Sequence, residues 1–214
     1  MGETSFRRSV ESGVVAILRA TSSNDLLNAT DAVLAGGVSS IEVTITTPGA
    51  LRIVEEARAR FGDEVSFGVG TVLDAESASA ALLAGAQFIV TPTLDVATIE
   101  LCRRYAVPVL SGAFTPTEIL GAWQAGADLV KVFPASAGGP TYIKTVRAPL
   151  PQVRIVAVGG VTLENTADFI RAGAELVGIG GELVSQRLLD ERDFAEITDR
   201  AKRFCERVAI GRER

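Results

Sequence analysis

The sequence contains no histidine. This absence excludes the Ser-His-Asp and Cys-His nucleophile systems, and it excludes imidazole as a general base. It also argues against a zinc site, because the usual nitrogen ligand is missing and only Cys102 and Cys205 remain as thiols. Any chemistry must therefore come from lysine, acidic residues, tyrosine, arginine or water.

Cysteine is scarce, long apolar runs are absent, and neither acidic nor basic residues cluster in one segment of the sequence. Two cysteines without metal-ligand spacing predict reduced thiols and a cytoplasmic protein. No apolar stretch approaches the length of a bilayer span, and the first residues lack an apolar run that would export or anchor the chain, so we expect no membrane partner. The net charge is −5 with acids and arginines interspersed, which argues against nucleic acid as a partner.

The pattern along the chain predicts eight strands that alternate with helices. Apolar, β-branched runs mark the strands at residues 14–19, 41–46, 66–72, 88–91, 108–111, 129–133, 154–158 and 176–179. We expect a short helix over residues 3–12 and an amphipathic helix over roughly 193–208. Ser22 and its neighbours offer caps for one helix, and Pro48 suits the first turn of the next.

A recurring sequence motif indicates an architecture built from repeated units. Four predicted helices end in similar alanine-glycine sequences, at Ala35-Gly36-Gly37, Ala84-Gly85-Ala86, Ala125-Gly126-Ala127 and Ala172-Gly173-Ala174. The spacing is roughly two β/α units, and glycine is the usual residue after a helix C-terminus. Without any linker or break in composition, the simplest interpretation is one α/β domain over residues 1–214, a (β/α)8 TIM barrel. An open doubly wound sheet fits less well, because its glycine-rich first turn is missing after residue 18.

Lys131 is the most unusual residue of the predicted strands. The chain has only two other lysines, Lys144 and Lys202, and both fall in helical stretches. Strand alternation places Val130 and Val132 on one face and Lys131 on the other, with Leu129 and Phe133. An amine in apolar surroundings has a lowered pKa and attacks a carbonyl carbon. The alternative is a structural lysine paired with a carboxylate.

Polar residues gather near the carboxyl ends of the predicted strands, among them Arg19, Glu42, Thr46, Ser111 and Lys131. In a (β/α)8 barrel these ends converge on the mouth that carries the active site. Alternation turns Glu42 and Thr46 inward, which places a carboxylate in the same interior as the lysine. Glu42 is then either an acid–base partner or half of a structural ion pair. Arg19 suits the binding of a carboxylate, or else closes the strand end by a salt bridge.

Two glycine clusters follow the last two strands, in Val158-Gly159-Gly160-Val161 and in Gly178-Ile179-Gly180-Gly181-Glu182. Turns after strands seven and eight commonly bind phosphate through backbone N–H groups. The simpler alternative is that the glycines only permit tight turns.

These motifs together resemble those of one enzyme family, the class I 2-keto-3-deoxy-6-phosphogluconate and 2-keto-3-deoxy-6-phosphogalactonate aldolases, some of which act on 4-hydroxy-2-oxoglutarate. The resemblance runs over nearly the whole chain in the correct order. It is carried by Lys131-Val132-Phe133-Pro134-Ala135-Ser136, Ile41-Glu42-Val43-Thr44, Gly68-Val69-Gly70-Thr71-Val72 and Val158-Gly159-Gly160-Val161.

The resemblance implies a (β/α)8 barrel, usually trimeric, that cleaves a phosphorylated keto acid to pyruvate and glyceraldehyde 3-phosphate without a cofactor or metal. Lys131 corresponds to the lysine that forms the Schiff base, and Glu42 corresponds to the proton-transferring glutamate. The remaining implied substrate contacts are Thr71, Pro92, Phe133, Gly159, Gly160, Gly180 and Gly181.

Several positions depart from parts of the family. Thr46 replaces an arginine that binds the substrate carboxylate in one branch, whereas Arg19 and Val158 resemble the phosphogalactonate branch. Gly181 replaces a serine often found near the phosphate, and Glu182 follows it.

Three other functions stay open. They are a 4-hydroxy-2-oxoglutarate aldolase, a phosphate-binding barrel isomerase or synthase that uses Lys131 only as a charge, and a non-catalytic protein that binds sugar acids.

Overall fold

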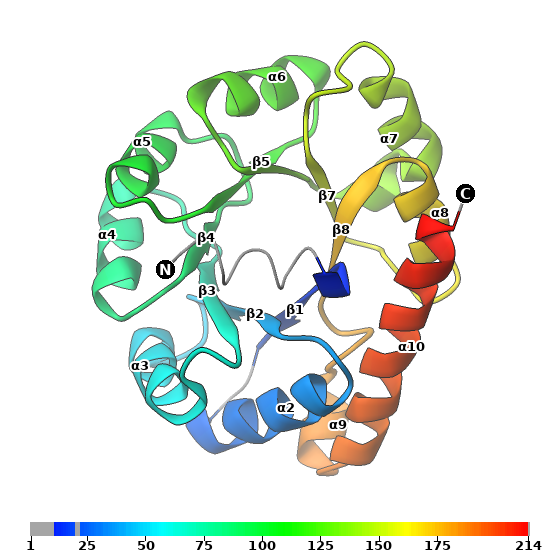
Figure 1. Ribbon diagram of the computed structural model, residues 1–214. Helices are drawn as coiled ribbons and strands as arrows, with labels where there is room; N and C mark the ends of the chain where they lie inside the picture. Colours follow the sequence, from blue (N-terminus) through cyan, green and yellow to red (C-terminus); the bar gives the residue numbers. More distant parts are fainter. Residues whose placement is uncertain (1–10, 20–21, 214) are drawn as a thin grey trace.

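The computed structural model describes residues 11–19 and 22–213. Eight parallel strands follow one another in sequence order and close into a barrel where β8 pairs with β1. Helices surround the ring of strands (Figure 1). The strands are β1 (Val14–Leu18), β2 (Ser40–Thr44), β3 (Ser66–Gly70), β4 (Phe88–Val90), β5 (Val109–Ala113), β6 (Leu129–Val132), β7 (Ile155–Val158) and β8 (Ala174–Ile179).

The outer layer consists mainly of the helices that connect successive strands. They are α2 (Ser23–Ala35), α3 (Ala50–Phe61), α4 (Ala75–Leu83), α5 (Val96–Arg104), α6 (Pro116–Ala125), the 3₁₀ turn η1 (Ala135–Ala137), α7 (Gly139–Arg147), α8 (Thr166–Arg171), α9 (Gln186–Asp190) and α10 (Phe194–Arg212). The last of these, α10, packs against both α8 and α2 and so covers the place where the barrel closes (Figure 1). In the part of the chain that the structure describes, no helix combines the length and apolar character needed to cross a membrane.

The predicted strands are confirmed, with each boundary within two residues of the observed one, and the closed ring excludes the open doubly wound sheet. Ser22 caps α2 by accepting a hydrogen bond from the Asp25 N–H. The expectation for Pro48 was wrong: α3 begins at Ala50 with Gly49 as its N-cap, so the proline lies in the preceding turn. The predicted helix over residues 3–12 lies largely outside the described residues.

The buried apolar residues form two layers, because side chains alternate along each strand. The inner layer fills the interior of the barrel. It consists of Val15, Ile17, Phe88, Val90, Leu110, Leu129, Val156, Val158 and Leu176. The outer layer packs the other face of the strands against the helices. The barrel is therefore a packed core below its mouth rather than a pore.

The recurring alanine-glycine phrases end helices as predicted. Gly37, Gly85, Gly126 and Gly173 all adopt φ values between +92° and +106°, where glycine avoids the strain of a side chain. Two of these turns are also bridged by an arginine from an earlier helix: Arg103 donates to the Ala125 carbonyl at 3.2 Å and Arg147 to the Gly173 carbonyl at 2.9 Å.

A cavity of about 770 Å³ lies at the amino-terminal end of the barrel, beside Arg147, Arg154 and Glu175. Arg147 also donates to the Pro151 carbonyl, and Arg154 makes two hydrogen bonds of 2.8 and 2.6 Å to Glu175. These arginines hold main-chain turns and neighbouring strands together at the end of the barrel opposite its mouth. Contacts at that end of a (β/α)8 barrel serve stability.

Gly112→Ala tests the packing of the upper barrel. A methyl group there would lie 2.1 Å from the Pro92 carbonyl carbon and 2.4 Å from the Thr93 nitrogen, and backbone atoms do not move aside easily. We expect the substitution to lower the free energy of unfolding by about 1–3 kcal/mol, measured by urea denaturation.

The matched control is Gly121→Ala within α6. The added methyl would meet only Leu94 Cδ2 at 3.2 Å, the end of a flexible side chain, and alanine favours the helix. This variant should be as stable as the wild type or more so. Equal stability of the two variants would contradict the packing described for Gly112.

Candidate active site

Lys131 lies in β6 and points into the barrel. Val130 and Val132 belong to the outer apolar layer and Leu129 to the inner one, as the alternation predicted. The lysine side of the strand is flanked by Gly112 on β5 and Val156 on β7. Only 5% of Lys131 is exposed. The amine is therefore nearly removed from water at the upper end of a closed ring.

Glu42 comes from β2, where Ile41 and Val43 belong to the outer layer and turn the glutamate inward. It is 2% exposed. Its carboxylate lies against the backbone of Gly70 on the adjacent strand, since a methyl group at that glycine would be 2.1 Å from Oε1. Gly70 thus makes room for the carboxylate.

Lys131 and Glu42 influence each other without forming a close ion pair. Among the described residues, no contact of 4.0 Å or less joins the lysine nitrogen to the carboxylate oxygens. Burial lowers the pKa of Lys131, while the negative charge of Glu42 opposes this shift and the positive charge of Arg19 adds to it. Burial raises the pKa of Glu42, and Lys131 and Arg19 both oppose that rise. Both groups are thereby shifted toward their neutral forms, as is common for groups that transfer protons.

Arg19 follows β1 directly and is exposed at the barrel mouth. Its electrostatic effect on both Lys131 and Glu42 places its charge near them. Thr71 follows β3 directly and is half-buried. A guanidinium and a hydroxyl group at this mouth are groups that bind a carboxylate.

Phe133 and Pro92 contribute apolar surface at the mouth. The Phe133 ring lies beside the amine, with Lys131 Nζ 5.2 Å from the ring centroid. The same ring lies against Gly159, where an added methyl group would be 3.1 Å from it. Half-buried Pro92 follows β4, and its carbonyl lies over Gly112.

The glycine turns after β7 and β8 form the outer edge of the same mouth. Gly159 and Gly160 adopt φ values of +90° and +75°. The Gly159 carbonyl accepts from the Ser136 N–H at 2.9 Å, and the Gly160 carbonyl accepts from the Asn165 amide at 2.9 Å. Gly180 and Gly181 follow β8, which pairs with β7. The residues predicted for the site therefore lie within their strands, as Glu42 and Lys131 do, or in the turns that follow the carboxyl ends of the strands.

Two expectations about polar residues were wrong. Ser111 faces the helices, because Leu110 belongs to the inner apolar layer and Val109 and Ala113 to the outer one. Thr46 does not point inward along a strand, because β2 ends at Thr44 and Thr46 is exposed in the turn that follows.

Three residues of the site were not predicted by sequence reasoning. Gly70 accommodates the carboxylate of Glu42, Gly112 accommodates Pro92, and the Ser136 side chain packs against Gly160. A glycine inside a predicted strand was the available signal for the first two, because such glycines often mark a close approach of another group. Ser136 lies in a motif that carries the family resemblance, but the sequence assigned it no role. In residues 11–19 and 22–213 no group of three or more histidine, cysteine or acidic side chains is placed to hold a metal ion.

The fold and the site define a (β/α)8 barrel protein with a desolvated lysine and a buried glutamate at its mouth. Residues 7–200 match the family model described as "Aldolase: KDPG and KHG aldolase". The chain therefore belongs to the KDPG and KHG aldolase family, and it is an aldolase, a lyase.

Two relatives named as aldolases agree with this placement. A 2-dehydro-3-deoxy-6-phosphogalactonate aldolase of Escherichia coli K12 is 35% identical over 91% of this chain and 96% of its own. A 2-dehydro-3-deoxy-phosphogluconate aldolase of Pseudomonas aeruginosa is 32% identical over 93% of this chain and 90% of its own.

One solved structure bears on the chemistry. The KDPG aldolase of Legionella pneumophila, with pyruvate captured at low pH as a covalent carbinolamine intermediate, is 25% identical to this chain. Its TM-score is 0.84, over 91% of this chain and 96% of that one.

The opposite effects of Glu42 and Arg19 on Lys131 give a testable prediction. Glu42→Gln removes a charge that favours the ammonium form, so the pKa of Lys131 should fall further below that of the wild type. Arg19→Gln removes a charge that disfavours it, so the pKa should rise. Reductive methylation followed by mass spectrometry measures the pH dependence for each lysine.

Lys144 and Lys202 are exposed and serve as internal references in the same samples. Their methylation curves should not change in either variant. If the pKa of Lys131 changed in the same direction in both variants, the charge arrangement described for Glu42 and Arg19 would be contradicted.

Proposed function

We propose that this chain is a Schiff-base aldolase that reversibly cleaves a 2-keto-3-deoxy-6-phospho sugar acid of the gluconate or galactonate series. The products are pyruvate and glyceraldehyde 3-phosphate. In this proposal Lys131 and Glu42 are the catalytic residues.

One observation carries the proposal. Lys131 is buried inside the barrel beside Glu42, yet no contact of 4.0 Å or less pairs their charges within the described residues. A structural ion pair would bring the two groups together, because burying charges is unfavourable unless they are closely paired. The lowered pKa of Lys131 instead increases the fraction of neutral amine, the form that attacks a ketone. The carbinolamine captured in the related Legionella enzyme is an adduct of pyruvate of the kind that this attack forms.

The first half of the reaction builds the electron sink. The neutral amine of Lys131 attacks the C2 ketone to give a carbinolamine, and loss of water gives a protonated imine. Glu42 then accepts the proton of the C4 hydroxyl, directly or through a water molecule. The C3–C4 bond breaks, its electron pair moves into the imine to form an enamine, and the aldehyde leaves.

The second half restores the enzyme. Glu42 returns the proton to C3 of the enamine, which regenerates the imine of pyruvate. Addition of water then releases pyruvate and the free amine of Lys131. The imine thus supplies the electrophile throughout, and the glutamate carries one proton in each direction.

The remaining site residues hold the two ends of the substrate. Arg19 and Thr71 bind the C1 carboxylate, and Pro92 and Phe133 contact the carbon chain beside the amine. The backbone of Gly159, Gly160, Gly180 and Gly181 binds the distal phosphate. Holding both ends keeps C2 within reach of Lys131, which converts binding energy into orientation.

A second candidate, 4-hydroxy-2-oxoglutarate, follows from the description of the family model, which names KHG aldolase beside KDPG aldolase. This shorter acid would be cleaved to pyruvate and glyoxylate by the same two residues, without using the glycine turns. Pyruvate release measured side by side on this acid and on the gluconate and galactonate epimers distinguishes the substrates.

We further propose that one barrel domain carries the whole activity, that the protein assembles as a homotrimer, and that it works in the cytoplasm. The trimer follows from the family resemblance. The location is supported by two free cysteines, of which Cys102 is buried and has its pKa raised to about 12.

Lys131→Ala should abolish aldolase turnover while leaving the fold intact, because no other group in the proposed site can form the imine. Borohydride with pyruvate should add a stable mass to the wild type, located at residue 131 by peptide mass spectrometry. A coupled pyruvate assay measures turnover on the same samples.

The control is Lys144→Ala, which removes an exposed lysine on α7 and should label as the wild type does. Continued labelling of the Lys131 variant would show that Lys131 is not the lysine that forms the imine. Complete failure to trap pyruvate in the wild type would favour an isomerase or synthase, or a protein that only binds sugar acids.

Glu42→Gln should still form the borohydride-trapped adduct but turn over about 10²–10⁴-fold more slowly, because the amide cannot carry the proton. Single-turnover measurements would separate adduct formation from bond cleavage. A near-normal kcat would refute the role of Glu42.

A further inference from the structure

The turn after β8, residues 180–185, is partly exposed and partly buried. Leu183 and Val184 are buried, and their N–H groups both donate to the Gly180 carbonyl at 2.9 and 3.0 Å. Gly181 and Glu182 are exposed between them and the strand. Gly181 and Glu182 are therefore the residues of this turn that a ligand at the mouth can contact.

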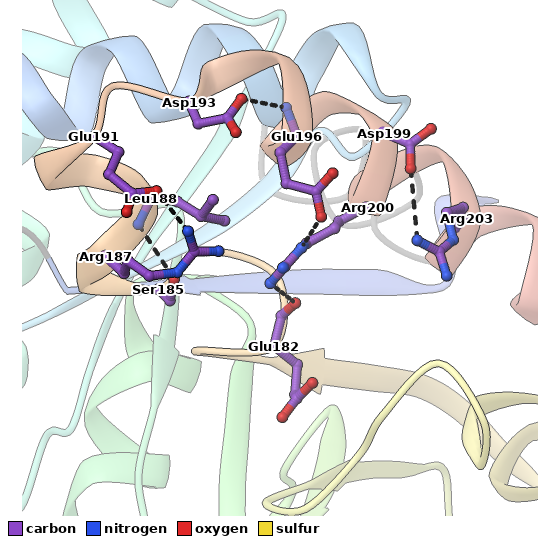
Figure 2. A network of polar contacts seen from close by, with 10 residues as sticks. All are labelled: Glu182, Ser185, Arg187, Leu188, Glu191, Asp193, Glu196, Asp199, Arg200 and Arg203. Carbon is purple, nitrogen blue, oxygen red and sulfur yellow. Dashed lines mark hydrogen bonds and ion pairs between the residues drawn. The ribbon is translucent and has the colours of Figure 1, made fainter.

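The main chain of Glu182 is fixed from α10. Arg200 Nη1 donates to the Glu182 carbonyl at 3.1 Å, and Arg200 Nε lies 2.7 Å from Glu196 Oε1 (Figure 2). The charge of Arg200 is thus paired with Glu196 rather than with the Glu182 side chain. Figure 2 shows the Glu182 carboxylate turned away from Arg200.

The Glu182 carboxylate is not paired with a positively charged side chain in the part of the chain that the structure describes. Within residues 11–19 and 22–213, no hydrogen bond or ion pair involves it. The sequences of the three turns that border this part of the mouth, residues 133–138, 159–165 and 180–185, contain no lysine or arginine. They contain two glutamates, Glu164 and Glu182.

Glu164 differs from Glu182 in a way that makes it a matched reference. A hydrogen bond from the Thr162 side chain lowers the pKa of Glu164, and the charges of Arg203 and Arg207 add to this effect. Glu164 is also exposed and lies in the neighbouring turn after β7, but its carboxylate interacts with its own turn and with these arginines. Glu182 therefore carries an exposed carboxylate without such partners in the turn after β8.

A phosphate in this region would be bound by backbone N–H groups beside a fixed negative charge. The repulsion between a carboxylate and a phosphate dianion at close range opposes the favourable N–H contacts. A terminal hydroxyl group meets no such repulsion and donates a hydrogen bond to a carboxylate.

We propose that Glu182 determines specificity at the far end of the substrate. Its carboxylate weakens the advantage of a terminal phosphate and accepts a hydrogen bond from a terminal hydroxyl. The preference of the enzyme for a phosphorylated over an unphosphorylated 2-keto-3-deoxy sugar acid is consequently reduced. This inference rests on the proposed aldolase function.

Glu182→Gln tests the inference, because it keeps the shape of the side chain and removes its charge. The measurement is kcat/KM for pyruvate release from a phosphorylated acid and from its unphosphorylated counterpart. We expect the ratio of the two values to rise at least tenfold over that of the wild type, mainly through the phosphorylated acid. Added salt should raise kcat/KM for the phosphorylated acid in the wild type and not in the variant, because it screens the repulsion.

Glu164→Gln is the control and should leave the ratio unchanged. Glu182→Ser provides a second variant without the charge, and it should raise the ratio in the same direction. Glu182 is exposed, and its carboxylate makes no hydrogen bond or ion pair within residues 11–19 and 22–213. Both variants should therefore melt within about 2 °C of the wild type.

An unchanged ratio in both Glu182 variants would overturn the inference, as would an equal rise in Glu164→Gln. Borohydride trapping with pyruvate separates this outcome from failure of the proposed function, since pyruvate does not reach the far end of the site. Trapping that persists with an unchanged ratio refutes only the role of Glu182. Absence of trapping in the wild type refutes the aldolase chemistry itself.

Discussion

The removal of one amine from water is the constraint on which the rest of this structure depends. Lys131 is 5% exposed inside a closed ring of strands, and burial lowers its pKa. An isolated ammonium there would be strongly disfavoured, so the surroundings must supply a balance of charge. Glu42 stabilises the charged form from across the barrel and Arg19 opposes it from the mouth. The proposed chemistry uses this balance, because a keto acid can be attacked only by the neutral amine.

The barrel provides this environment through alternation along its strands. On β6, Val130 and Val132 pack against the helices while Leu129 fills the interior below Lys131. On β2 the same rule turns Glu42 inward between Ile41 and Val43. The apolar inner layer fills the interior of the barrel, which leaves the carboxyl ends of the strands as the side from which Lys131 is approached. The proposed catalytic groups and the stabilising contacts of Arg147 and Arg154 thus lie at opposite ends of the barrel.

The far end of the mouth differs in character from the lysine end. Near Lys131 the structure concentrates three charged groups whose fields act on one another. Around Gly159 and Gly181 it offers backbone groups, no cation within the bordering turns, and the free carboxylate of Glu182. The lysine end carries the groups that the proposed aldolase chemistry uses. The far end carries the groups that we propose to set the choice of substrate.

The sequence alone determined the number, order and approximate bounds of the strands and the inward direction of Lys131 and Glu42. These depend on periodicity and on helix-ending glycines, both of which are local. It misjudged Ser111 and Thr46 because strand ends and exact phase at the mouth depend on neighbouring strands. Only the tertiary structure decided that the lysine and glutamate are near but unpaired, that Gly70 and Gly112 receive groups from adjacent strands, and that Arg200 fixes the backbone of Glu182. The physical reason is that these features are distances between residues far apart in the chain, which are set by closure of the barrel.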